Sequence, residues 1–243
     1  MKQSQSQWQT RELATFFLDG VRGAIPGAAL QLSVLSKIVQ SWLPGPKRIL
    51  DLGCGDGILG RTLMDIFPMT DMVFADFSEP MLEAAKEKLK GKPRAAVIHC
   101  DFSSPQWLGQ PHLNAPFDII VSGFAIHHQP DQRKKELYGE IYNLLSENGL
   151  FLNLEHVSSA TNDISKVFDD YFVDSLYTFH QSTGSSDSRE EIEKTYYDRP
   201  DKVENLLAPL GLQCQWLKQI GFQDVDCFFK IFELALFGGR KRT

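Results

Sequence analysis

The sequence lacks the patterns that mark metal-binding, disulfide-stabilised and membrane-spanning proteins. Its 243 residues contain four cysteines, none at the CxxC spacing of a zinc site: Cys54, Cys100, Cys214 and Cys227. We interpret them as reduced, buried thiols and predict no metal site. No apolar run reaches the roughly 18 residues needed to cross a bilayer, and residues 1–10 lack the apolar core of a secretory signal. The sequence therefore favours a cytoplasmic protein that does not enter a membrane.

The chain also contains fewer basic than acidic residues. The chain has 25 Lys and Arg against 31 Asp and Glu, which gives a formal net charge of -6. Such a balance provides no general attraction to nucleic acid or to an anionic membrane, although a local basic patch is left open. The favoured partner is a small molecule. The oligomeric state, monomer or homodimer, is not decided by the sequence.

The hydrophobic pattern predicts an α/β fold. Hydrophobic residues make up 42% of the chain, enough for the core of one such domain. Residues 12–21 and 29–43 carry apolar side chains at helical spacing around a Pro/Gly break at 22–27. From residue 48 onward, strands and helices alternate. This alternation predicts a doubly wound, Rossmann-like sheet of seven strands, mostly parallel, that ends in an antiparallel C-terminal hairpin.

The elements expected after residue 47 begin with a βαβ unit, and their bounds follow from apolar runs and from turn residues. They are strand 48–52, helix 58–67, strand 72–77, helix 78–90 capped by Ser78, strands 94–102 and 116–124, helix 131–149, strand 149–157, helix 203–221 and two strands within 222–241. Residues 158–200 break this rhythm, and we interpret them as a lid or cap insertion.

A glycine turn, "GCGDG" at residues 53–57, follows the first expected strand, where a doubly wound sheet binds its ligand. Its spacing differs from the G-x-G-x-x-G of dinucleotide-binding proteins, and no P-loop pattern occurs. Asp51 and Asp56 flank the turn, and no Lys or Arg stands between Asp51 and Arg61. These acids disfavour a phosphate and favour a cation.

A further acid, Asp76, ends the second expected strand about twenty residues after the glycines, where a carboxylate can accept hydrogen bonds from both hydroxyls of an unmodified ribose. Together with the glycine turn, it predicts a nucleoside ligand that carries a positive charge and no phosphate.

These motifs resemble those of the class I S-adenosylmethionine-dependent methyltransferases. The resemblance covers "ILDLGCGDG", "ADFSEPMLEAAKEKL", "IHCDF" and "FDIIVSGFAIHH", in the order and spacing of that superfamily. It implies S-adenosylmethionine as cofactor and residues 47–243 as the methyltransferase domain. Residues 1–46 would then be an N-terminal helical cap segment, and about 158–200 a cap insertion.

The resemblance also implies a role for each cofactor-binding position. Asp51 with the Gly53 and Gly55 backbone would face the methionine part, and Asp76 would hold the ribose. Phe77 and Met81 would flank the adenine, Asp101 would accept from its amino group beside Phe102, and Ser122 to Phe124 would line the methionine and the reacting end.

The outer segments around residues 21–39 and 216–241 resemble a narrower group, which includes bacterial tRNA wobble-uridine carboxymethyltransferases and many small-molecule methyltransferases. The "PGY" of that group is Pro26-Gly27-Ala28 here, and its tRNA enzymes have a different glycine turn. Both departures, and the acidic balance, weigh against a carboxylated cofactor and against tRNA. We therefore expect methyl transfer to a small-molecule acceptor, with a tRNA-modifying enzyme as the alternative.

Candidate catalytic residues follow the fourth and fifth expected strands. His127 and His128 lie in "AIHHQP" and Glu155 in "FLNLEH", so each is at the end of the sheet where the ligand binds. Each can act on an acceptor proton or serve only in packing and loop hydrogen bonds. Candidate acceptor-binding residues are Arg22, Tyr171, His180 and Arg199, for which core packing or a surface charge is the alternative.

Overall fold

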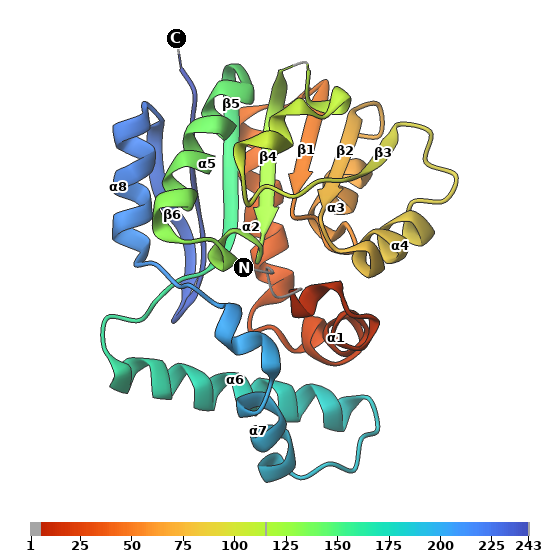
Figure 1. The fold of residues 1–243 in the computed structure, drawn as a ribbon, viewed down its shortest axis with the longest axis vertical. Coiled ribbons are helices and arrows are strands. Elements are labelled where there is room, and N and C mark those ends of the chain that lie inside the picture. The colour runs from red at the N-terminus through yellow and green to blue at the C-terminus, as the bar shows by residue number, and fades with distance from the viewer. Residues whose placement is uncertain (1–5, 115, 243) are drawn as a thin grey trace.

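The computed structural model describes residues 6–114 and 116–242 and contains one seven-stranded sheet (Figure 1). The strand order is β3-β2-β1-β4-β5-β7-β6, in which β7 runs antiparallel to β5 and β6, and the other neighbours are parallel. The predicted doubly wound sheet with a C-terminal antiparallel hairpin is confirmed. The strands are β1 (Arg48–Leu52), β2 (Asp71–Asp76), β3 (Ala95–His99), β4 (Phe117–Gly123), β5 (Leu145–His156), β6 (Gln223–Ile231) and β7 (Leu234–Arg240).

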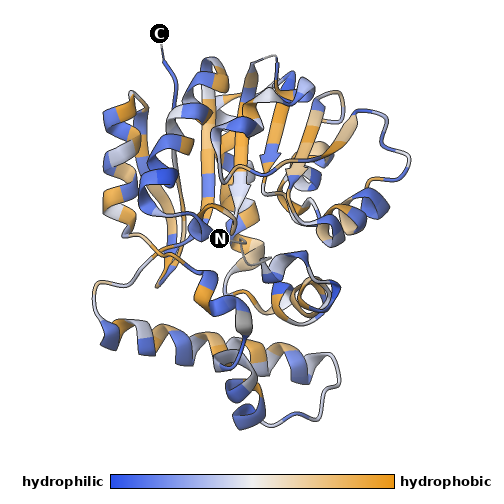
Figure 2. Ribbon diagram, viewed as in Figure 1, coloured by the Kyte–Doolittle hydropathy of each residue, from blue (hydrophilic) through white to orange (hydrophobic). Residues whose placement is uncertain are grey.

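Helices cover both faces of this sheet because side chains alternate along its strands. In β1, Leu50 and Leu52 pack with α5 (Asp131–Leu144) and α8 (Leu210–Ile220), whereas Ile49 packs on the opposite face. That face is covered by α2 (Ala28–Trp42), α3 (Ile58–Ile66) and α4 (Glu79–Lys88). Figure 2 accordingly shows the strands as mostly hydrophobic and the helices as mixed.

A third apolar cluster is formed mainly by segments that lie beyond the carboxyl ends of β1, β2 and β4, as the ribbon in Figure 1 shows. It joins the N-terminal segment, which contains α1 (Arg11–Phe16), to α6 (Asn162–Ser182) and α7 (Arg189–Tyr197). Phe168 and Phe172 of α6 pack against the end of the sheet at Leu234. The Thr161 hydroxyl accepts from the Ile164 N–H at the start of α6, and a capping box begins α7. Residues 158–200 therefore contribute a helical cap.

Several expected bounds are wrong. Helix α5 ends at Leu144, and "LSENG" begins β5 instead. Helix α8 begins at Leu210, after Pro209, rather than at residue 203. Ser78 stands at the start of α4 but does not cap it, because its hydroxyl donates to the Trp8 carbonyl at 2.5 Å. Within the part of the chain that the structure describes, no helix is long and apolar enough to cross a membrane.

The pairing of β5 with β7 requires a glycine at position 238. A Cβ atom there would lie 2.0 Å from the Phe151 carbonyl oxygen of β5. We predict that Gly238→Ala lowers the free energy of unfolding by about 1 to 3 kcal/mol, since the two strands must separate. Gly139→Ala in α5 is the control, because a Cβ there meets nothing within 4 Å. Urea denaturation measures both, and equal stability of the two variants would contradict the close approach.

Candidate active site

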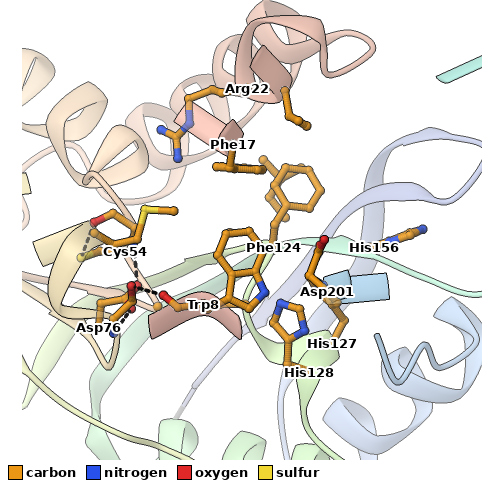
Figure 3. Close-up of a pocket in the computed structure, with 18 of the residues that line it drawn as sticks. Trp8, Phe17, Arg22, Cys54, Asp76, Phe124, His127, His128, His156 and Asp201 are labelled. Atoms are coloured by element: carbon orange, nitrogen blue, oxygen red, sulfur yellow. Dashed lines mark hydrogen bonds between the residues drawn. The ribbon is translucent and has the colours of Figure 1, made fainter. Parts of the chain in front are cut away.

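A cavity of about 710 Å³ opens at the carboxyl ends of β1, β2 and β4, beneath the helical cap (Figure 3). Its volume suits a nucleoside cofactor together with a small acceptor. Its walls come from the glycine turn, from the loops after β2, β3 and β4, from the N-terminal segment and from α6 and α7. The cavity lies where a doubly wound sheet binds its ligand.

The glycine turn brings bare backbone to the cavity wall. Gly53 and Gly55 have φ values of 67° and 54°, a region that side-chain-bearing residues rarely adopt. The Gly53 and Cys54 N–H groups both donate to the Ala75 carbonyl, at 2.7 and 3.1 Å, which fixes the turn to β2. A Cβ at Gly53 would lie 2.3 Å from the Ala125 Cβ, so glycine is also required for packing.

Asp51 is a buried acid with a free oxygen. Its side chain is 1% exposed, and Oδ2 accepts from the Gly60 N–H at 2.8 Å. Oδ1 has no hydrogen-bond partner among residues 6–114 and 116–242. Burial and, to a smaller extent, the nearby Asp76 charge raise the pKa of Asp51 to about 8, although the bond from Gly60 lowers it. A positively charged ligand group at this position would supply the missing partner.

Asp76 organises the end of β2. Its Oδ2 accepts from the Gly55 N–H and its Oδ1 from the Ser78 N–H, both at 2.8 Å. Burial raises the pKa of this carboxyl, whereas these backbone bonds lower it. Each oxygen keeps a lone pair that can accept from a ligand hydroxyl.

Asp56, expected to add negative charge beside the ligand, does not line the cavity. It is fully buried and forms ion pairs with Arg22, Arg61 and Lys88, of which the Arg61 pair is 3.2 Å long. These cations offset its charge, so the acids that face the cavity near the turn are Asp51 and Asp76. Arg22 itself lines the cavity beside the glycine turn, not at the end expected for an acceptor.

The remaining cofactor-binding candidates divide into two groups. Phe77, Met81, Asp101, Phe102 and Phe124 line the cavity. Ser122 does not line it, because its buried hydroxyl donates to the Leu52 carbonyl at 2.7 Å and holds β4 to β1. A side chain in the middle of a parallel ladder points into the core more readily than into a cleft.

His127 and Glu155 form a buried pair at the cavity wall. The Glu155 Oε1 lies 2.7 Å from the His127 Nδ1, so a neutral imidazole donates there and has its lone pair on Nε2. The His127 ring also forms a hydrogen bond with the side chain of Asn205. Burial lowers the pKa of His127 well below its usual value and raises that of Glu155 to about 7. His127 lines the cavity, whereas Glu155 lies behind it.

Two further histidines lie beside this pair. The His128 ring is tilted by 43° against the His127 ring, with ring centroids 3.9 Å apart, and its Nδ1 is 3.1 Å from the Glu204 carbonyl oxygen. Burial lowers the pKa of His128 to about 3. His156 lines the cavity from the end of β5, and its Nε2 lies 2.8 Å from the Glu233 Oε2.

Only part of the expected acceptor-binding set faces the cavity. Arg199 lines it, but Tyr171 is 41% exposed and packs against Phe232, and the His180 Nδ1 lies 3.8 Å from Asp187. In α6 the cavity is lined by Phe168 and Phe172, which are four residues apart and so share one face of the helix.

Trp8 and Glu204 belong to the site but were not predicted from the sequence. The Ser6 hydroxyl and the Gln7 N–H donate to the two oxygens of Glu204, at 2.7 and 2.8 Å. Trp8 lines the cavity, between Phe17 and His128 (Figure 3). A single aromatic residue in a Gln/Ser-rich start was the available signal.

Comparison with known proteins agrees with this geometry. Residues 49–149 match the family described as a methyltransferase domain. The chain is 26% identical over 234 residues to the carboxy-S-adenosyl-L-methionine synthase of a Nitratiruptor species, covering 95% of this chain and 91% of that protein. It is 30% identical over 138 residues to the demethylmenaquinone methyltransferase of Leptospira interrogans, covering 57% of this chain and 54% of that protein.

A solved structure of similar fold is the CurJ carbon methyltransferase, with a TM-score of 0.64 and 16% identity. The alignment covers 95% of this chain and 58% of that one, so the chain spans less than two thirds of its length. At this identity the likeness concerns the fold alone.

The sheet order, the acid-flanked glycine turn and the family match place the protein among the class I S-adenosylmethionine-dependent methyltransferases. Residues 49–149 match the methyltransferase domain family named above, which supports S-adenosylmethionine as the cofactor. The resemblance inferred from the sequence motifs is thereby confirmed.

Glu204 holds the N-terminal segment over the cavity, which can be tested directly. We predict that Glu204→Ala lowers hydrogen-exchange protection of residues 6–10 by about tenfold or more, because two bonds to a carboxylate are lost. Glu204→Gln is the matched control, since it keeps an oxygen that accepts from the Gln7 N–H, and it should retain part of the protection. Unchanged exchange in Glu204→Ala would show that these bonds do not hold the segment.

Proposed function

We propose that the protein transfers the methyl group of S-adenosylmethionine to a hydroxyl of a small planar acceptor, with His127 accepting the hydroxyl proton. The observation that carries the proposal is the His127–Glu155 pair in the wall of the cavity that also contains Asp51 and Asp76. A base is needed only for an acceptor that must lose a proton, and a hydroxyl is such a group.

The residues at the glycine turn fit the cofactor. The unpartnered Asp51 Oδ1 suits the ammonium group, the free lone pairs of Asp76 suit the ribose hydroxyls, and Arg22 beside Gly55 suits the carboxylate of the methionine part. Phe77, Met81 and Asp101 remain our candidates for the adenine. Bound S-adenosylmethionine would supply a methyl group activated by a positively charged sulfur.

The chain's own residues would hold the acceptor and move its proton. Glu155 fixes the tautomer of His127, so that Nε2 is the atom that accepts the proton, and its negative charge stabilises the imidazolium that forms. His127 is uncharged at neutral pH because burial lowers its pKa, and it is therefore ready to accept. Alignment of the hydroxyl by the cavity wall supplies much of the rate.

The acceptor end of the cavity favours a planar molecule. The rings of Phe124, Phe168, Phe172 and Tyr196 line this end, and Phe172 stacks on Tyr196 with centroids 5.5 Å apart. Aromatic walls bind planar acceptors by stacking and exclude water from the methyl transfer.

A second candidate is the synthesis of carboxy-S-adenosylmethionine. It is favoured by the alignment with the Nitratiruptor synthase over 95% of the chain. This reaction requires a second substrate that donates a carboxyl group, and mass spectrometry of the cofactor product distinguishes the two, since only this reaction yields a carboxylated sulfonium. No feature of the described residues favours the tRNA alternative, and the net charge of -6 opposes it.

Cofactor binding should release a proton from Asp51. With a pKa of about 8 this carboxyl is mostly protonated at pH 7, and an ammonium group favours its ionised form, so affinity should rise between about pH 6 and pH 8. Titration calorimetry with S-adenosylhomocysteine in two buffers of different ionisation enthalpy measures the proton. Asp51→Asn should abolish the release and Asp101→Asn should retain it. Binding without proton exchange in the wild type would reject the assignment of Asp51.

Methyl transfer should depend on the His127–Glu155 pair. We predict that His127→Asn lowers kcat by about 100-fold or more while the affinity for S-adenosylhomocysteine stays within about twofold. For the wild type, kcat/KM should fall as the pH drops through about 7, because the pair takes up a proton and Nε2 can no longer accept one. The assay follows S-adenosylhomocysteine formation with a panel of phenols and hydroxylated heteroaromatics.

Two outcomes would contradict the proposal. A wild-type rate in His127→Asn would show that His127 is not the base. Failure of every hydroxylated acceptor in the panel, with the cofactor still bound, would reject hydroxyl methylation as the activity.

A further inference from the structure

The acceptor end of the cavity contains one ion pair whose hydrogen-bonding capacity is only partly used. The Arg199 Nη2 lies 3.2 Å from the Asp201 Oδ2, and both residues line the cavity. The other Asp201 oxygen, Oδ1, and the Arg199 Nε have no partner in the described part of the chain. Asp201 is only 3% exposed, so water offers little compensation for this free oxygen.

We infer that Arg199 and Asp201 form a recognition site for an uncharged acceptor group that both donates and accepts hydrogen bonds, such as a carboxamide or a second hydroxyl, and that Asp201 excludes acceptors carrying a carboxylate there. The inference rests on the proposed function for the identity of the bound molecule as the acceptor. It also limits the expected acceptor-binding role of Arg199 to an uncharged group.

The charges around the pair support an uncharged ligand group. The negative charge of Asp201 offsets the positive charge of Arg199, so the pair offers a bound carboxylate no net attraction. Lys202 does not line the cavity, because its ammonium lies 3.9 Å from Asp169 and over the Tyr196 ring. A ligand carboxylate beside Asp201 would bring two like charges together in a buried site.

The positions of the surrounding groups indicate how an acceptor would be oriented in the cavity. The guanidinium of Arg199 lies 5.4 Å from the centre of the Tyr196 ring, which fixes it at the aromatic wall. Figure 3 shows Asp201, Trp8, His127 and His128 around the same space. The indole N–H of Trp8 is also buried without a partner in the described residues. A planar acceptor with one hydroxyl near His127 and a polar group at Asp201 would satisfy both ends.

The test compares two phenols that differ only in the charge of the second group. We expect 4-hydroxybenzamide to bind the wild-type complex with S-adenosylhomocysteine at least about tenfold more tightly than 4-hydroxybenzoate, because like charges oppose the latter. In Asp201→Asn this preference should shrink by about tenfold or disappear, because the repelling charge is gone. Calorimetry measures both affinities. Asp198→Asn is the matched control, since Asp198 is exposed and does not line this cavity.

The affinity for S-adenosylhomocysteine and the thermal unfolding temperature show that each variant is folded. Three results would overturn the inference: equal or tighter binding of 4-hydroxybenzoate, an unchanged preference in Asp201→Asn, or no saturable binding of either phenol. The measurement requires no turnover. Selective binding without methyl transfer would therefore support this site and reject the proposed activity. Methyl transfer without selective binding would support the proposed activity and reject this site.

Discussion

The site depends on two hydrogen bonds that the Asp76 carboxylate accepts from backbone N–H groups. One oxygen fixes the glycine turn through the Gly55 N–H and the other fixes the start of α4 through the Ser78 N–H. The Ser78 hydroxyl in turn holds the Trp8 carbonyl, so a single acid at the end of β2 connects the turn, a helix and the N-terminal segment. Burial makes its ionised form costly, and the backbone donors offset that cost. The cavity therefore has a rigid, electron-rich floor before any ligand arrives.

The parallel sheet explains why groups so distant in sequence meet. Asp51, Asp76 and Glu155 come from the same end of three parallel strands, where their residues necessarily gather. The cap closes this end with aromatic side chains from α6 and α7, and the N-terminal segment completes the wall. Under the proposed function, the acids near the glycine turn form the region for a cation, and His127 and His128, whose pKa values are lowered by burial, lie in the region for proton transfer.

Sequence patterns were sufficient to place those candidate residues that lie within or directly after a strand. The glycine turn, Asp51 and Asp76 follow strands with clear apolar runs, so the fold itself places them. Contacts between distant segments could not be predicted in this way. Glu204 bonds to Ser6 from 198 positions away, and neither residue belongs to a periodic pattern. The cations that offset Asp56 lie outside the turn whose charge was considered, and helix rotation decided that Phe168, and not Tyr171, lines the cavity.

The central claim is that one cavity binds a sulfonium nucleoside on the glycine turn and directs its reacting end toward His127. A crystal structure of the protein with S-adenosylhomocysteine tests this most directly. The account predicts that the ribose lies at Asp76, the amino group at Asp51, and the sulfur on the side of the cavity that contains His127. A nucleoside bound elsewhere, or with its sulfur directed away from the histidines, would contradict it.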